Sequence, residues 1–409
     1  DEVSGFSVNK SVPFGARKIW RKDNVKLNVL LNVPENFFCA KKWAQIDIKN
    51  VPSVCLKQKT KALLNEKLKD ASDSFTEETG NRYPGNEDRI TCRKNMIEFF
   101  TKNKTVNCSQ LFPHQISGDI SNHLNISSQE KIINMKMWDS LVRYTQDRVS
   151  KYLKENTKNC NNSLSTGNII CCADVSGSML SPGVPPNRPF DISVALTAFM
   201  SQLANDSFKD IVMTFTDVPT IYNLKKNGLS MTMYDRISTI RSHVGYSTNY
   251  IGIHKCLIRL CIERKINEND LPCLVIFTDG HFDSMMGINA TKTSHSSVIE
   301  LWVNAGYRKI PQIVYWNLAS NKNSVQTNSS FPNVQLLSGY SISNLKYVMY
   351  GEIAEEKTQT VVINGESIEI KTKNITPEQT MRKALDEPYF ECVRNILRGS
   401  NENELKHFN

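Results

Sequence analysis

The protein has 409 residues, of which 40% are hydrophobic, 22% charged and 9% aromatic. These proportions exclude collagen-like, mucin-like and largely disordered chains, and they suffice for two or three hydrophobic cores. The net charge of +9 lies in residues 1–165, which hold 27 Lys and Arg against 18 Asp and Glu, whereas residues 166–409 hold 23 of each. The basic part is therefore predicted to present either a polyanion-binding surface or a solvated, Lys-rich helical surface.

No run of the sequence approaches the roughly 18 uncharged apolar residues of a membrane helix, so we expect no membrane insertion. The 11 cysteines are odd in number and spread through the chain. This distribution is typical of buried thiols in a reduced, intracellular protein, and it lacks the two CxxC pairs of a zinc ribbon.

Residues 1–160 are predicted to be helical. Val51–Leu68 opens with a Pro-Ser start signal and continues with apolar side chains at helical spacing. A second periodic segment surrounds Phe99, and a long amphipathic one covers Ile132–Leu153. The polar, breaker-rich stretch 156–167 follows, and it predicts a domain boundary.

Residues 166–350 alternate short apolar runs with amphipathic helices, which is typical of a doubly wound, mainly parallel sheet covered on both faces. The predicted strands are Ile169–Ala173, Ile211–Phe215, Cys273–Phe277, Ile313–Trp316 and Val334–Leu337. The predicted helices are Ile192–Ala204, Tyr250–Arg264 and Ser296–Ala305. In the C-terminal extension, residues 351–409, we expect a β-hairpin over Thr360–Ile370, turning at an Asn-Gly pair, and a helix over Pro377–Leu397.

Polar side chains follow two of the predicted strands where each strand ends. Asp174, Ser176 and Ser178 come directly after the first strand, and Asp279 follows Cys273–Phe277. A third polar turn, which contains Thr248, precedes a predicted helix. Ligands of open parallel sheets bind outside the carboxyl ends of the strands, so these turns are the expected location of a site.

Two carboxylates and three hydroxyls form a set of hard oxygen donors, which suits an octahedral Mg²⁺ or Mn²⁺. The carboxylates cancel the charge of the metal, and a position remains for water or for an acidic group from outside. The alternative is that Ser176 and Ser178 only cap the following helix, which is a common use of serine.

A nucleophilic serine is the enzymatic alternative. The elbow motif requires Gly two residues before the serine, where this chain has Asp174. His243 and His281 lie near the polar turns, so a general base stays open, although a lone strand-end His is more often structural. The sequence contains no Walker loop, no His-Glu-X-X-His and no Rossmann glycine fingerprint. We therefore expect a binding protein without catalytic activity.

The strand-end residues resemble the metal-ion-dependent adhesion site of a von Willebrand factor A domain, over about 180 residues. The resemblance implies that Asp174, Ser176, Ser178, Thr248 and Asp279 hold the metal and that an acidic residue of a partner protein completes the site.

Further strings resemble a family, found in giant viruses and plants among others, that pairs a helical region with such a domain. They are Trp43-Ala44-Gln45-Ile46-Asp47, Leu111-Phe112-Pro113-His114, Ile313-Val314-Tyr315-Trp316 and Ser338-Gly339-Tyr340-Ser341. The layout is similar to the Ro autoantigen (TROVE-like) family, whose ring of HEAT-like helices binds small noncoding and misfolded RNAs.

The Ro-like layout implies a ribonucleoprotein whose basic helical region binds RNA or another polyanion, in the cytoplasm or associated with a viral factory or virion. The candidate contacts are the paired or alternating cations Arg17, Lys18, Arg21, Lys22, Lys41, Lys42, Lys57, Lys59 and Lys61. The rival interpretation is a protein scaffold or virion component that captures an acidic residue of another protein through the metal site.

Overall fold

The computed structural model describes most of the chain. The described residues are 14–67, 80–119, 126–156, 167–279, 288–319, 333–340, 356–373 and 377–385, with gaps at 104, 182, 216–217, 243–244, 246–248 and 364, and isolated residues beyond them. The chain divides into two compact units. Unit 1 comprises residues 1–110 and 125–140, and unit 2 comprises residues 111–124 and 141–409.

Unit 1 is helical. Its helices are α1 (Phe14–Leu30), α2 (Pro34–Cys39), α3 (Ser53–Leu63), α4 (Glu87–Lys102) and the first part of α6 (Ser128–Asn156), with short 3-10 turns η1 (Trp43–Gln45) and η2 (Ile48–Asn50). Helix α4 begins at Asn86, whose side chain accepts a hydrogen bond from the backbone N–H of Arg89, as is typical of an N-cap. Leu63 and Met96 are fully buried in its core.

Unit 2 is built on a six-stranded sheet in the order β3-β2-β1-β6-β7-β8. Its strands are β1 (Ile169–Asp174), β2 (Ile211–Phe215), β3 (Thr220–Asn223), β6 (Cys273–Thr278), β7 (Ile313–Asn317) and β8 (Val334–Ser338). All neighbouring pairs are parallel except β2 and β3, which are antiparallel. The carboxyl ends of β1 and β6 consequently lie side by side in the middle of the sheet.

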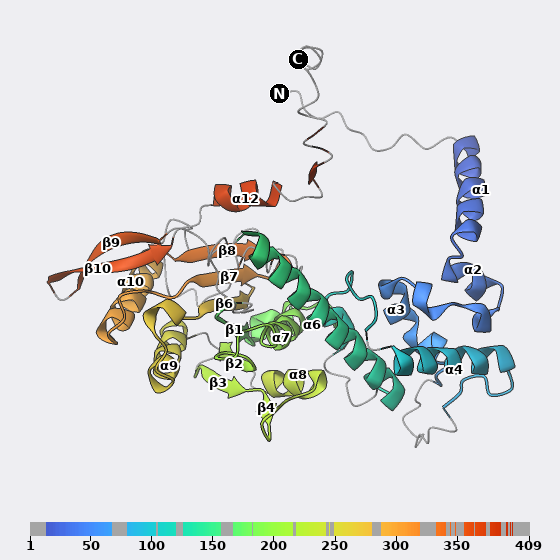
Figure 1. Ribbon diagram of the computed structural model, residues 1–409, viewed down its shortest axis with the longest axis horizontal. Coiled ribbons are helices and arrows are strands. Elements are labelled where there is room, and N and C mark those ends of the chain that lie inside the picture. Colours follow the sequence, from blue (N-terminus) through green and yellow to red (C-terminus); the bar gives the residue numbers. More distant parts are fainter. Residues whose placement is uncertain are drawn as a thin grey trace, which may run out of the picture. The chain divides into compact units, whose positions relative to one another are not determined.

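Helices cover both faces of this sheet (Figure 1). They are α7 (Pro189–Met200), α9 (Tyr250–Glu263) and α10 (Ile288–Asn304), and α5 (Pro113–Ser117) and α8 (Met233–Arg241) pack against α7. One face carries Ile170 and Cys172 of β1 against side chains of α9 and α10, such as Leu257 and Trp302. Helix α7 packs on β1 and β6 and is buried along its whole length. Burial on both sides explains why the central strands are continuous apolar runs.

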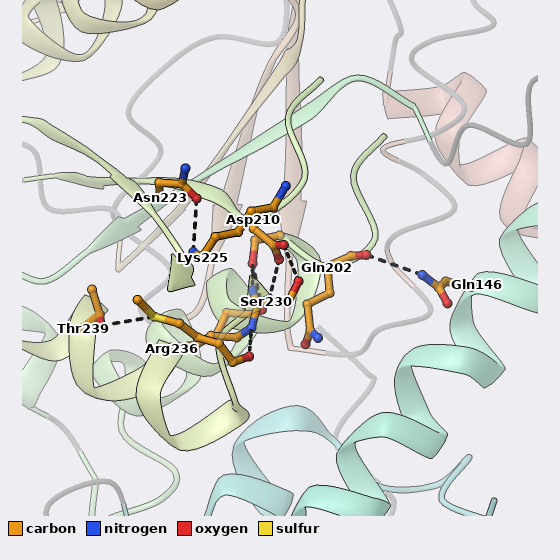
Figure 2. A network of polar contacts seen from close by, with 11 residues as sticks. Gln146, Gln202, Asp210, Asn223, Lys225, Ser230, Arg236 and Thr239 are labelled. Atoms are coloured by element: carbon orange, nitrogen blue, oxygen red, sulfur yellow. Dashed lines mark hydrogen bonds and ion pairs between the residues drawn. The ribbon is translucent and has the colours of Figure 1, made fainter. Parts of the chain in front are cut away.

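A buried polar network closes the amino edge of the sheet (Figure 2). Asp210, the residue before β2, forms an ion pair with Arg236 of α8, and both side chains are fully buried. The other nitrogens of Arg236 donate to Ser201 Oγ at 3.1 Å and to the Met231 carbonyl at 2.9 Å. Ser230 Oγ donates to the second oxygen of Asp210 at 2.5 Å. The network thereby fastens α8 to the start of β2.

The C-terminal hairpin consists of β9 (Glu356–Ile363) and β10 (Glu366–Lys373), followed by α12 (Pro377–Leu385). Gly365 in its turn has φ of 83°, which suits the expected Asn-Gly turn. Most of the predicted helix beyond Leu385 lies outside the described residues.

The fold class predicted from the sequence is confirmed: a helical N-terminal region precedes a doubly wound, mainly parallel α/β domain, with a hairpin and a helix after it. Helices α1 and α8 and the antiparallel strand β3 were not anticipated. In the described part of the chain, no helix is long and apolar enough to cross a membrane.

Candidate metal site at the carboxyl edge of the sheet

The site begins at the last residue of β1, Asp174. The register that pairs Ala173 with Phe277 sets Asp174 beside Thr278, the last residue of β6. Thr278 donates its hydroxyl hydrogen to Asp174 Oδ2 at 2.8 Å. The backbone N–H of Ser176 donates to the other carboxylate oxygen, Oδ1, at 3.0 Å. Both oxygens of Asp174 are therefore held in place from within the fold.

The serines of the same loop lie next to each other. The hydroxyl oxygens of Ser176 and Ser178 are 3.1 Å apart. Ser176 precedes the 3-10 turn η5 (Gly177–Leu180), but its side chain makes no capping hydrogen bond there. Ser176 is buried and Ser178 is exposed. The hydroxyl pair thus extends from the buried carboxylate to the protein surface.

The second polar turn comes close to the first loop. A parallel bridge joins Ser176 to Gly245, and the backbone N–H of Gly245 donates to the Val175 carbonyl at 3.4 Å. Gly245 is three residues before Thr248, which itself lies outside the described residues, as do His243 and His281. The structure therefore brings together Asp174, Ser176 and Ser178, with Asp279 one residue beyond the adjacent strand, and places the start of the Thr248 turn beside them.

The electrostatics of the site are dominated by two buried carboxyl groups. Asp174 is 0% exposed and Asp279 is 2% exposed. Burial raises the pKa of Asp174 to about 6, the hydrogen bonds from Ser176 and Thr278 oppose this rise, and the nearby charge of Asp279 adds to it. No cationic side chain of the described residues takes part in this balance. Two like charges that share a buried site favour either a proton or a bound cation.

The residues present fit a divalent cation bound through oxygen. Carboxylate and hydroxyl oxygens are the ligands that Mg²⁺ and Mn²⁺ prefer. Among the described residues no group of three His, Cys, Asp or Glu side chains forms a metal cluster, so a site for zinc or a similar metal is absent from that part of the chain. The candidate site at the sheet edge is not such a group, because its donors are two carboxylates and the hydroxyls of serine side chains.

Thr278 is the site residue that sequence reasoning missed. Its hydroxyl fixes Asp174 across the strand pair, although 104 positions separate the two residues in the chain. The signal for it was present, since Thr278 directly precedes Asp279 in the turn that was singled out.

The predicted cationic contacts occupy varied positions in unit 1. Lys18, Arg21 and Lys22 are exposed on α1, whereas the side chain of Arg17 lies outside the described part. Lys41 and Lys42 are exposed after α2, and Lys59 and Lys61 on α3.

Lys57 differs from these cations because it is partly buried. Its Nζ donates to Asn134 Oδ1 at 2.6 Å. Burial lowers the pKa of Lys57 to about 8.

A family model described as a domain of unknown function, DUF7788, matches residues 168–385, which is more than half of the chain. The chain belongs to this family. The DUF7788 region contains the whole candidate metal site. A search of curated proteins gives no match. Among solved structures, the crystal structure of the Deinococcus radiodurans RO (RSR) protein is similar at 12% identity and a TM-score of 0.41, over 76% of this chain and 58% of that chain. This chain thus covers less than two thirds of the length of that protein.

Proposed function

We propose that this DUF7788 protein is a non-catalytic binding protein that holds Mg²⁺ or Mn²⁺ at the carboxyl edge of its sheet and uses the metal to capture an acidic group. The observation that supports this proposal is the buried pair Asp174 and Asp279 beside the exposed hydroxyl of Ser178. Asp174, Ser176, Ser178 and Asp279 would hold the metal, and we assign Thr248 as a fifth ligand. The bound metal supplies positive charge for an acidic side chain of a partner protein.

A binding role accounts for these residues better than a catalytic one. Catalytic Mg²⁺ generally acts beside a phosphate-binding loop, and the sequence contains no Walker loop. A nucleophilic serine requires a base within hydrogen-bond reach. The hydroxyl of Ser176 instead lies against the hydroxyl of Ser178. We therefore expect no metal-dependent cleavage of RNA or of phosphate esters.

Metal titration by calorimetry tests the proposal. Asp174→Asn keeps the size of the side chain and removes its charge, so we expect Mg²⁺ and Mn²⁺ affinity to fall at least 100-fold while the fold is retained. Asp206→Ala is the control, because Asp206 is an exposed carboxylate away from the strand ends, and its affinity for metal should match that of the wild type. Equal affinity in Asp174→Asn would reject the site.

A second candidate function is the binding of RNA or another polyanion by unit 1. It is supported by the exposed cations Lys41, Lys59 and Lys61, which line a single cleft. Contacts to phosphate release counterions, so the affinity for a single strand should fall with salt at a log–log slope of about −0.7 per contact, or about −4 for six contacts. Titration of the full chain with single-stranded RNA at several salt concentrations measures this slope. An association with an acidic protein and none with RNA would favour the scaffold interpretation instead.

A further inference from the structure

A cleft of about 670 Å³ opens in unit 1 between α2, α3 and the start of α4. This volume lies within the range of about 300–1,000 Å³ that is usual for small-molecule sites. Five cationic side chains line the cleft, and Glu66 supplies its carboxylate. The cations are Lys41, Lys59, Lys61, Arg82 and Arg89. Lys61 lies 3.8 Å from Glu130, so part of its charge is balanced, but the excess of positive charge favours an anionic ligand.

Aromatic side chains stand among these cations. Phe38 and Trp43 pack with ring centroids 4.7 Å apart. Tyr83 is 47% exposed, and the guanidinium of Arg82 lies 5.5 Å from the centre of its ring. Aromatic faces beside cations are what single-stranded nucleic acids use, because bases stack on the rings while phosphates bind the positive charges.

Trp43 and Arg89, which line the cleft, are each held by several contacts within unit 1. The carboxylate of Asp88 accepts hydrogen bonds from the backbone N–H groups of Trp43 and Ala44, at 2.7 and 2.9 Å. The guanidinium of Arg89 stacks on the Trp43 ring at 3.6 Å from its centre, and Nη2 of Arg89 donates to the Ala62 carbonyl at 2.5 Å. These contacts fix the aromatic and cationic groups before any ligand arrives, which lowers the entropic cost of binding.

Two polar atoms of the lining have no hydrogen-bond partner among the described residues. Arg89 is only 7% exposed, and its Nε lacks an acceptor. Oε2 of Glu66 is also covered and lacks a donor. Buried polar groups without partners are costly, so they indicate a missing ligand or solvent molecule.

We propose that this cleft binds one nucleotide of single-stranded RNA, with the base against the aromatic side chains and the phosphate against the lysines. The inference rests on the proposed RNA binding of unit 1 and assigns a position to it. It predicts that Tyr83 contributes stacking and that Lys59 contributes phosphate contact.

The test measures binding of the full chain to a fluorescent 12-nucleotide single strand of RNA, to a duplex of the same length and to nucleoside monophosphates. Tyr83→Ala should weaken single-strand binding about tenfold, in line with the loss of one stacked base, and leave duplex binding unchanged. Lys59→Ala should make the salt slope shallower by about 0.7. Two controls lie outside the cleft. Tyr144→Ala removes a partly exposed tyrosine with an arginine 5.7 Å from its ring. Lys102→Ala removes an exposed lysine of unit 1, the unit that contains the cleft.

The outcomes separate the two proposals. If the single strand binds and Tyr83→Ala behaves like Tyr144→Ala, RNA binding stands and the cleft is rejected as its site. If the wild-type chain binds no single strand, both proposals fail. Tighter binding of monophosphates than of the oligonucleotide would also overturn the inference, because the cleft would then serve a free nucleotide.

Discussion

Buried carboxylates at the two edges of the central sheet of unit 2 have different surroundings. At the amino edge, Asp210 is paired with Arg236, and hydroxyl and carbonyl groups complete the network (Figure 2). At the carboxyl edge, Asp174 and Asp279 share a buried site with hydroxyls, and the charge of Asp279 raises the pKa of Asp174. The first carboxylate is paired with a cation, whereas the two carboxyl groups at the other edge lie close enough for the charge of one to disfavour ionisation of the other.

This contrast distinguishes a structural network from the candidate metal site. A buried charge is tolerated when a partner of opposite charge and enough hydrogen bonds surround it. The Asp210–Arg236 pair satisfies this condition and has no exposed side chain. The carboxyl edge holds two buried carboxyl groups close together and reaches the surface through Ser178. Mutations at the two edges should therefore have different consequences.

The largest effect is expected at the amino edge. Arg236→Ala leaves Asp210 buried without its cation, so the free energy of unfolding should fall by about 3–5 kcal/mol. Chemical denaturation measures this loss. The control is Arg259→Ala, which breaks an ion pair whose side chains are 69% and 64% exposed and should cost about 0.5 kcal/mol or less.

A double variant tests the same prediction if Arg236→Ala does not fold. Asp210→Asn together with Arg236→Met removes both charges, and Asn tolerates the left-handed backbone of position 210, where φ is 66°. Part of the lost stability should return, because no uncompensated charge remains. A double variant less stable than Arg236→Ala would contradict the view that the buried charge causes the loss.

The comparison also explains what the sequence could and could not predict. The candidate ligands were found because the topology of parallel sheets places strand ends together, and apolar runs mark the strands. Helix α7 was predicted as an amphipathic helix over Ile192–Ala204, whereas the structure buries it along its whole length. The Asp210–Arg236 pair was not predicted, because its residues lie 26 positions apart and neither stands at a strand's carboxyl end.

The cleft in unit 1 was also beyond sequence reasoning. Its lysines were candidates, but Arg89 joins them through the packing of α3 against α4, and Tyr83 through hydrogen bonds with Asn65. Alternate spacing on a helix points Lys57, Lys59 and Lys61 in different directions. In the structure Lys57 bonds to Asn134 while Lys59 and Lys61 line the cleft. Tertiary contacts therefore decide which of these charges face solvent.

His114 is another buried ionisable group of unit 2, and its burial makes the stability of the fold depend on pH. His114 is 1% exposed, it stacks on Phe112, and its Nδ1 has no hydrogen-bond partner among the described residues. Burial lowers its pKa to about 4. The unfolded chain, with a His pKa near 6.5, binds the proton more strongly, so stability is lost as the pH falls from about 6.5 to 4.

His114 contributes a loss of about 3 kcal/mol over this pH range, whereas the raised pKa of Asp174 contributes in the opposite direction as the pH falls through about 6. Denaturation of the wild type and of His114→Asn at several pH values tests the contribution of His114. The variant loses packing at every pH and lacks this titration, so the stability of the wild type relative to the variant should fall by about 3 kcal/mol within this window, while above pH 7 the difference between the two proteins should be constant. The same pH dependence in both proteins would show that other groups cause it.

The smallest expected change in the free energy of unfolding is at the carboxyl edge, and its sign is opposite to that of the change at the amino edge. Asp279→Asn removes the nearby charge that adds to the raised pKa of Asp174, so in metal-free buffer the free energy of unfolding should rise. Mg²⁺ at 100 times its dissociation constant should stabilise the wild type by about 2.7 kcal/mol, since it binds only the folded state. The variant should lose this stabilisation. Thermal unfolding with and without Mg²⁺ measures both effects, and a variant that is less stable without metal yet still stabilised by Mg²⁺ would assign Asp279 a structural role, like that of Asp210.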